Sequence, residues 1–227
     1  MQLKTRLIRT NKLYFGEYPY KAEFHLNGTA LIRVRGVEWV RQWCLSDKPN
    51  ILKGYHSSVD KVVLYKFLKT IEPYLEFDHK IRAENSTFNY YSKDIDVIRK
   101  LEKELKWCLY ATYGPETQEE LDFLTDGTKK ILCDAKPYGL YRFKVTLREN
   151  IPANTRKQFV EWASKYDAEQ IRFTKSTESW LDSKTPYVQA PYFYMADDKM
   201  LMMAHLFLSN HIKKVEEYIP RYTLISE

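Results

Sequence analysis

The sequence has few of the residues that build common catalytic and cofactor sites. Its seven glycines are scattered, and no two of them stand close together. Loops that cradle phosphates need glycine for close backbone approach and for positive φ, so no such loop is expected. The chain also has no HxH, HExxH, CxxC or GxSxG sequence. These absences argue against a zinc site, a metal-dependent nuclease site and a serine nucleophile.

Cysteine and long apolar runs are also scarce. The three cysteines, Cys44, Cys108 and Cys133, are too few and too scattered for a disulfide framework, so we expect buried free thiols in a reducing compartment. Residues 1–10 alternate basic and apolar side chains without the apolar core of a signal peptide. No run approaches the roughly 20 apolar residues that span a bilayer. We therefore expect a cytoplasmic protein with no membrane contact and no cofactor.

What the chain does have is a large apolar and aromatic content and an uneven charge. Apolar residues make up 44% of the sequence, which is enough for a packed core and argues against global disorder. The net charge is +6, and residues 1–35 alone hold seven bases against two acids. Between Gly114 and Gly127 the charged residues are all acidic. The basic excess is therefore a feature of the first 35 residues.

The first half of the chain shows a mixed order of strands and helices. Residues 20–26 alternate polar and apolar side chains, which predicts a half-buried strand. Asn27-Gly28 suits a type I′ turn, so residues 31–34 are expected to return as a hairpin strand. A helix is expected from residue 59, capped by Ser58 and ended early by Pro73. Strands at 79–85 and 87–91, a helix capped by Ser92 or Asp94, and a strand at 107–113 follow.

The second half shows a similar order. Strands are predicted at 141–147, 170–175 and 192–195, with a helix capped by Asn154 after the first of them. Asp197 is expected to cap a long helix that Pro220 stops, and residues 221–226 then form the last strand. The intervening residues 115–138 predict a short acidic helix at 116–124 and a short strand at 130–133.

This repeated order predicts an α+β fold with two tandem βαββαβ units, each an antiparallel sheet covered by helices. We expect residues 1–114 to form the first unit, 115–138 an acidic connector and 139–227 the second, with the two sheets packed together. Tyr90 and Asp94 match Tyr194 and Asp198 at an offset of 104 residues. The alternative is a single larger mixed sheet with coincidental similarity. The element order resembles that of ferredoxin-like and RRM proteins, although the RNP1 sequence of RRMs is absent.

The remaining chemical candidates have structural interpretations. His205 lies in an apolar helical segment and is expected to be a core histidine. Asp197 and Asp198 precede an apolar helix, where capping and the helix dipole explain them better than a carboxylate pair does. We therefore predict no catalytic residue, no metal site and no enzyme activity.

Aromatic and basic residues suggest nucleic-acid binding instead. Phe88 and Tyr90 alternate on one predicted strand, and Tyr192 and Tyr194 do so on another. The RRM resemblance implies that such rings lie on the open face of the sheet, where bases stack on them. The alternative is that the rings pack the two sheets together or line a partner interface. The basic residues that could bind phosphate are Lys4, Arg6, Arg9, Lys12, Arg33 and Arg35. Their alternative role is to protect an edge strand from pairing.

Residues 14–20 (YFGEYPY) and 193–198 (FYMADD) resemble stretches of small uncharacterised proteins of tailed bacteriophages, which implies a location in the host cytoplasm. The first hypothesis is a non-enzymatic protein that binds single-stranded nucleic acid, with RNA preferred. The second is a protein-interaction module, either a virion or assembly component or an inhibitor of a host protein, acting with a protein partner or as a homo-oligomer. A nuclease with unrecognised residues is a minor third hypothesis.

Overall fold

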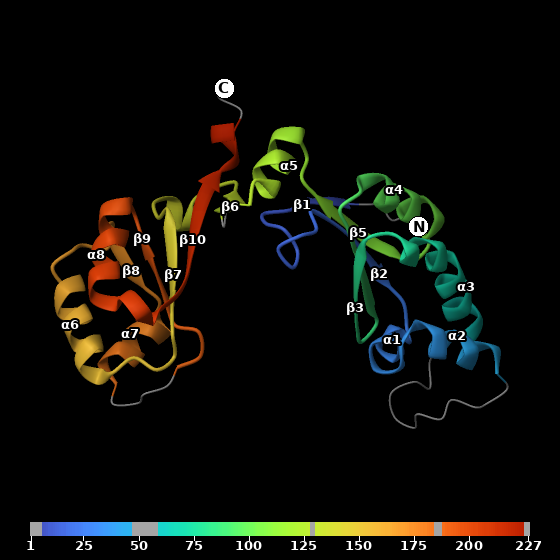
Figure 1. Ribbon diagram of the computed structural model, residues 1–227, viewed down its shortest axis with the longest axis horizontal. Helices are drawn as coiled ribbons and strands as arrows, with labels where there is room; N and C mark the ends of the chain where they lie inside the picture. Colours follow the sequence, from blue (N-terminus) through green and yellow to red (C-terminus); the bar gives the residue numbers. More distant parts are fainter. Residues whose placement is uncertain (1–5, 47–58, 128–129, 184–187, 225–227) are drawn as a thin grey trace. The chain divides into compact units, whose positions relative to one another are not determined.

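The chain forms two compact units, Met1–Thr125 and Asp126–Glu227. The computed structural model describes residues 6–46, 59–127, 130–183 and 188–224. Each unit has one five-stranded sheet with helices on one of its faces (Figure 1). The predicted acidic connector is divided between the units. Its helix, α5 (Gln118–Thr125), falls in the first unit, and its strand, β6 (Lys130–Cys133), joins the sheet of the second.

The first sheet has the strand order β1-β5-β2-β4-β3. Its strands are β1 (Arg6–Arg9), β2 (Tyr20–His25), β3 (His79–Glu84), β4 (Thr87–Ser92) and β5 (Leu109–Gly114). Strand β1 runs parallel to β5, and the other neighbours are antiparallel. The helices of this unit are α1 (Thr29–Arg35), α2 (Val37–Leu45), α3 (Lys61–Ile71), α4 (Ile95–Glu104) and α5, with a 3-10 helix at Glu72–Glu76.

The core of the first unit forms where helix stripes meet the inward side chains of the sheet. Leu64, Phe67, Leu68 and Ile71 of α3 are fully buried, and Phe67 packs against Phe24 of β2 and Phe88 of β4. Asp60 caps this helix by accepting hydrogen bonds from the Val62 and Val63 amides, whereas Ser58 lies outside the described residues. The helix gives way to the 3-10 turn that contains Pro73, as predicted.

The second sheet has the order β6-β10-β7-β9-β8. Its strands are β6, β7 (Phe143–Leu147), β8 (Ile171–Phe173), β9 (Tyr192–Met195) and β10 (Ile212–Pro220). The helices are α6 (Ala153–Ala163), α7 (Lys175–Asp182) and α8 (Asp198–Leu208), with 3-10 turns at Pro137–Gly139, Ser209–His211 and Arg221–Leu224. Asp197 caps α8 as predicted, but α6 begins after Pro152 and not after Asn154.

Both sheets connect their strands in the same order. In each unit the strand that comes first in the chain (β1 or β6) runs parallel to the strand that comes last (β5 or β10). We call the other four strands of each unit, in chain order, its core strands. The fourth core strand (β5 or β10) pairs with the first (β2 or β7), and the first pairs with the third (β4 or β9). The second core strand, β3 or β8, pairs with the third and forms the edge of the sheet. The α+β class is confirmed, and the alternative of one larger mixed sheet is wrong.

The predicted hairpin after Asn27-Gly28 is wrong. Gly28 has a φ of 97° and precedes α1, a helix that covers the residues expected to return as a strand. Strand β4 takes the place beside β2 that the hairpin strand would have filled. A Cβ at Gly28 would lie 2.8 Å from Val59 Cγ1, so glycine serves a close approach as well as a positive φ. The β-branched residues of α1 favoured a strand, but tertiary packing decided otherwise.

The long final helix is also wrong. Helix α8 ends at Leu208, and β10 begins at Ile212 and runs to Pro220. The apolar residues at 208, 212, 215 and 219 fit a helical stripe, yet residues 215 and 219, four apart, also share one face of a strand. The predicted strand at 221–226 is not observed, because residues 221–224 form a 3-10 turn and the rest lies outside the described residues.

Candidate nucleic-acid interface

The aromatic pair predicted in the first unit faces the wrong way for ligand contact. Phe88 and Tyr90 do share one face of β4, but that face packs on the helices and both rings are fully buried. The Tyr90 hydroxyl donates a hydrogen bond to the Tyr74 carbonyl oxygen over 2.6 Å. Strand alternation shows which residues share a face without showing which face is covered. The expectation that these two rings lie open is therefore wrong.

The pair predicted in the second unit does lie on the open face. Tyr192 and Tyr194 are half-buried and alternate with Phe193 and Met195, which are fully buried in the core. The two tyrosine rings contact each other with centroids 5.7 Å apart. Burial raises the pKa of Tyr194 to about 12, so its hydroxyl is neutral at physiological pH.

The predicted basic residues that the structure describes lie on separate elements of the first unit. Lys4 lies outside the described residues, and Arg6 and Arg9 lie on β1 at the edge of the first sheet. Arg9 forms an ion pair with Glu116. Lys12 is exposed in the connection after β1.

Arg33 and Arg35 belong to the helical side of the first unit. Both lie on α1, whose buried residues join the helix-covered core. Arg33 lies 3.8 Å from Glu84, and the Arg35 guanidinium lies over the ring of Trp39. Neither arginine lies on the open face of a sheet.

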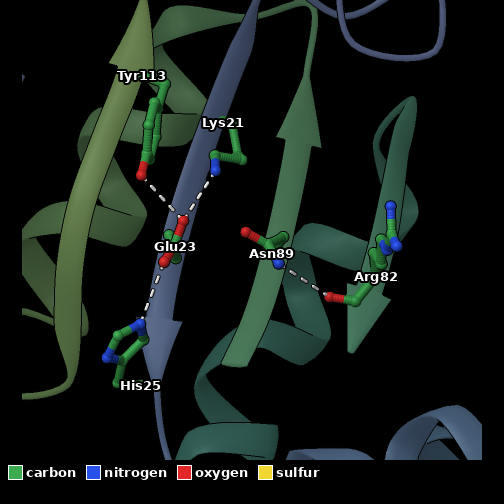
Figure 2. Close-up of polar contacts among 6 residues, drawn as sticks. All are labelled: Lys21, Glu23, His25, Arg82, Asn89 and Tyr113. Carbon is green, nitrogen blue, oxygen red and sulfur yellow. Dashed lines mark hydrogen bonds and ion pairs between the residues drawn. The ribbon is translucent and has the colours of Figure 1, made fainter. Parts of the chain in front are cut away.

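The centre of the open face in the first unit is a shielded carboxylate on β2 (Figure 2). Glu23 accepts hydrogen bonds from Lys21 Nζ at 2.8 Å, from the Tyr113 hydroxyl at 3.0 Å and from the His25 ring at 3.1 Å. Its side chain is only 15% exposed. Burial alone would raise the pKa of Glu23, but the hydrogen bonds from Lys21 and His25 outweigh burial and lower it. The carboxylate is therefore ionised, and its charge is compensated by neighbours.

The residues around Glu23 form an ordered polar surface. His25 stacks on Tyr110 with ring centroids 4.2 Å apart and planes 8° apart. On the other side, Asn89 of β4 lies opposite Glu23 of β2 and donates a hydrogen bond to the Arg82 carbonyl oxygen (Figure 2). Tyr110 is largely exposed, so this face presents an aromatic surface beside hydrogen-bonding groups.

An aromatic residue in the β1–β2 connection folds over the same face. Phe15 has a φ of 55° and is followed by Gly16 with a φ of 77°. The Phe15 ring packs edge-on against Tyr91 of β4 with centroids 4.9 Å apart. Lys80 of β3 places its ammonium 4.3 Å from the centre of the Phe15 ring. We call this group of turn ring, strand tyrosine and edge-strand cation the stacked trio.

The second unit contains an equivalent stacked trio. Tyr138, in the β6–β7 connection, has a φ of 52° and is followed by Gly139 with a φ of 77°. Its ring packs edge-on against Tyr194 of β9 at 5.6 Å. Arg172 of β8 places its guanidinium carbon 4.1 Å from the centre of the Tyr138 ring. Lys80 pairs with Tyr91, and Arg172 pairs with Tyr194, so the two trios also share their strand register.

A shielded carboxylate occurs on the second open face as well. Glu216 of β10 is 7% exposed and accepts a hydrogen bond from Lys214 at 2.6 Å. Lys144 lies opposite Glu216 across the strands, and its ammonium is 4.1 Å from the centre of the Tyr192 ring. The lysines of both sheets thus contact a carboxylate and a tyrosine together, as Lys21 does over Tyr113 at 3.5 Å. Such contacts fix long side chains on the open face.

The stacked trios have a signal in the sequence. Residues 14–26 (YFGEYPYKAEFHL) and 137–149 (PYGLYRFKVTLRE) align without gaps at an offset of 123 residues. The alignment matches Gly16 with Gly139, Tyr18 with Tyr141 and Lys21 with Lys144. The offset of 104 residues that matched Tyr90 with Tyr194 is wrong by one residue. Tyr91, and not Tyr90, occupies the place of Tyr194.

The remaining chemical candidates are metal ligands, cysteines and one histidine. Within residues 6–46, 59–127, 130–183 and 188–224, no group of three or more His, Cys, Asp or Glu side chains could hold a metal ion. All three cysteines are free, and burial raises the pKa of Cys108 to about 12. His205 is exposed, so its prediction as a core histidine is wrong. Among the described helices, none is long and apolar enough to cross a membrane.

Comparisons with known proteins give no further guidance. No protein-family model, no curated protein and no solved structure matches the chain. The resemblance to tailed-bacteriophage proteins stays a prediction.

Proposed function

We propose that this chain is a non-enzymatic protein that binds single-stranded nucleic acid, with RNA preferred. The observation that supports this most is the open face of the second sheet, where the Tyr194 ring contacts both Tyr138 and Tyr192. Two cations, Arg172 and Lys144, lie over the outer two of these rings. Stacking on an aromatic side chain contributes about 1–3 kcal/mol per base, and the adjacent cations suit the phosphates.

The fold supports the same proposal. We propose that each unit is a ferredoxin-like, RRM-like βαββαβ unit with one added leading strand, and that the two arose by internal duplication. In RRMs the open face of the sheet stacks unpaired bases on aromatic rings. Bases within a duplex are already stacked on each other, so surface rings favour single strands over duplexes.

Binding to labelled oligonucleotides, measured by fluorescence polarisation over a salt series, tests the proposal. We expect the full chain to bind single-stranded RNA more tightly than DNA of the same sequence, and both more tightly than a duplex. Tyr138→Ala should weaken binding by roughly five- to one-hundred-fold, because one stacking contact is lost. Tyr65→Ala, on the helical side of the first unit, is the matched control and should bind as the wild type does.

The basic residues near the beginning of the chain provide a second measurement. Replacing Arg6, Arg9 and Lys12 together by Glu should weaken binding and reduce the steepness of its salt dependence, by about two units of slope if each contacts one phosphate. Absence of binding at low salt, or an unchanged affinity of the Tyr138→Ala variant, would refute the proposal. Intact RNA after long incubation with divalent metals would separate binding from cleavage.

Association with another protein is the second candidate function, and the outer face of α8 favours it. Met202 and Leu206, one helical turn apart, are 61% and 73% exposed. Helix α4 follows the equivalent strand of the first unit, and its exposed residues include Asp96, Arg99 and Lys100. Light scattering after size-exclusion chromatography decides this candidate. A wild type that forms an oligomer which Leu206→Glu dissociates would support it. A monomeric wild type that captures no protein would count against it.

A further inference from the structure

The two stacked trios share a feature of the backbone that is uncommon and energetically unfavourable. Phe15 and Tyr138 both adopt a left-handed conformation, with φ of 55° and 52°. For residues with a Cβ this conformation costs about 1–2 kcal/mol, and bulky residues rarely adopt it. Among the aromatic residues that the structure describes it occurs twice, at equivalent places, and each time the next residue is a glycine with a φ of 77°. Strain that recurs at equivalent places indicates that the position of the aromatic ring matters to the protein.

The requirement is not simply to bury the turn ring. Phe15 is 49% exposed and Tyr138 is 61% exposed, although each packs against a tyrosine of the sheet. In the first unit, Tyr91 beneath the turn is only 5% exposed, so the ring that the sheet contributes is covered. The strained turn therefore lifts an aromatic ring onto the surface of the open face and holds it there.

Each lifted ring lies beside a positive charge from the edge strand. The cation-to-ring distances are 4.3 Å for Lys80 and 4.1 Å for Arg172. An exposed ring and a cation side by side match the two parts of a nucleotide, a flat base and a phosphate. Glu23, a carboxylate on the same open face, already receives three hydrogen bonds (Figure 2), so neighbouring groups compensate its negative charge.

We infer that the chain has two equivalent nucleotide sites, one on the open face of each sheet. Each site binds one base of a single-stranded nucleic acid on the turn ring, Phe15 or Tyr138. The edge-strand cation, Lys80 or Arg172, contacts the adjoining phosphate. The inference rests on the proposed function for the second unit. It adds a first-unit site that uses Phe15 in place of the buried Phe88 and Tyr90.

Counting sites with a short probe tests the inference. Isothermal titration calorimetry of the full chain with a uridine trinucleotide should give two sites per chain. Phe15→Ala and Tyr138→Ala should each leave one site, and the double variant should leave none. Phe15→Tyr and Tyr138→Phe keep a ring at each place and should retain both sites. Hydrogen exchange of the β2 and β7 amides checks that each variant keeps its sheet.

The outcomes separate this inference from the proposed function. One site that is lost in Tyr138→Ala and unchanged in Phe15→Ala would overturn the inference and leave the proposed function standing. Two sites that survive Phe15→Ala would also overturn it, because the first site would then lie elsewhere. No binding by the wild type would overturn both.

Discussion

Replacing Glu23 by glutamine tests whether the shielded carboxylate organises the open face of the first sheet. The substitution keeps the size of the side chain but removes the negative charge that attracts the Lys21 ammonium at 2.8 Å. The amide also places an NH2 group where one carboxylate oxygen accepted, either Oε1 from His25 or Oε2 from Lys21 and Tyr113. A hydrogen bond to a charged group contributes about 1.5–3 kcal/mol. Because the amide retains one accepting oxygen, we expect a net loss of about 2 kcal/mol at pH 7.

The pH dependence of this loss follows from the lowered pKa of Glu23. Hydrogen bonds from Lys21 and His25 lower that pKa in the folded state against the opposing effect of burial. A carboxyl group with a lowered folded pKa stabilises the fold above its unfolded pKa of about 4.5 and loses that contribution as pH falls through the folded value. The difference between the variant and the wild type should therefore be full at pH 7 and shrink as the pH falls below the unfolded pKa of about 4.5.

Hydrogen exchange of the β2 amides, measured by mass spectrometry, is a suitable assay because it reports the opening of this strand locally. A loss of 2 kcal/mol corresponds to roughly a thirty-fold loss of protection at pH 7. Glu17→Gln, an exposed position in the preceding connection, is the control and should leave protection unchanged. Equal protection of Glu23→Gln and wild type at pH 7, or the same loss at pH 3 and pH 7, would refute the reasoning.

Two further substitutions test the core. Tyr90→Phe removes the buried hydrogen bond to the Tyr74 carbonyl oxygen, which then keeps a longer bond from the Phe77 amide at 3.4 Å. We expect the first unit to be destabilised by about 1–3 kcal/mol in urea denaturation; no loss would show that water replaces the hydroxyl. Gly114→Ala would place a Cβ 2.7 Å from Cδ1 of the buried Tyr20 ring, so the ring must shift at a cost of about 1–3 kcal/mol. If the clash is the cause, Gly114→Ala combined with Tyr20→Leu should lose less than the two single variants together.

The sequence predicted most strands because their alternation is a local property. Residues 20–26, 79–85 and 192–195 were each expected as strands and are observed as β2, β3 and β9 within a residue or two. Pairing of those strands, however, depends on distant residues. The hairpin signal at Asn27-Gly28 was outweighed because β4, some 60 residues later, pairs with β2.

The candidate site was only half predictable, for a similar reason. Alternation correctly grouped Phe88 with Tyr90 and Tyr192 with Tyr194, but a one-residue difference decides which face is open. Phe88 meets Phe24 and Phe67 in the core, whereas Tyr194 meets Tyr138 on the open face. The turn rings could have been found from the aligned residues 14–26 and 137–149, but their left-handed backbone has no sequence signal beyond the glycine that follows.

The spacing of the stacked trios shows which part of the fold is retained between the units. The turn rings are 123 residues apart, the strand tyrosines 103 and the edge-strand cations 92. The offset falls from 123 to 92 because the first unit has three helices between β2 and β3, whereas the second has α6 alone between β7 and β8. It rises again to 103 because α7 lies between β8 and β9, whereas β3 is followed directly by β4. A single-offset comparison of the sequence therefore cannot align all three members. Although the helical connections differ, the three members meet at the same strand register on both open faces. Packing on the helical side does not require the two trios to share a strand register. We therefore expect the two units to bind the same kind of ligand, and to bind it on their open faces.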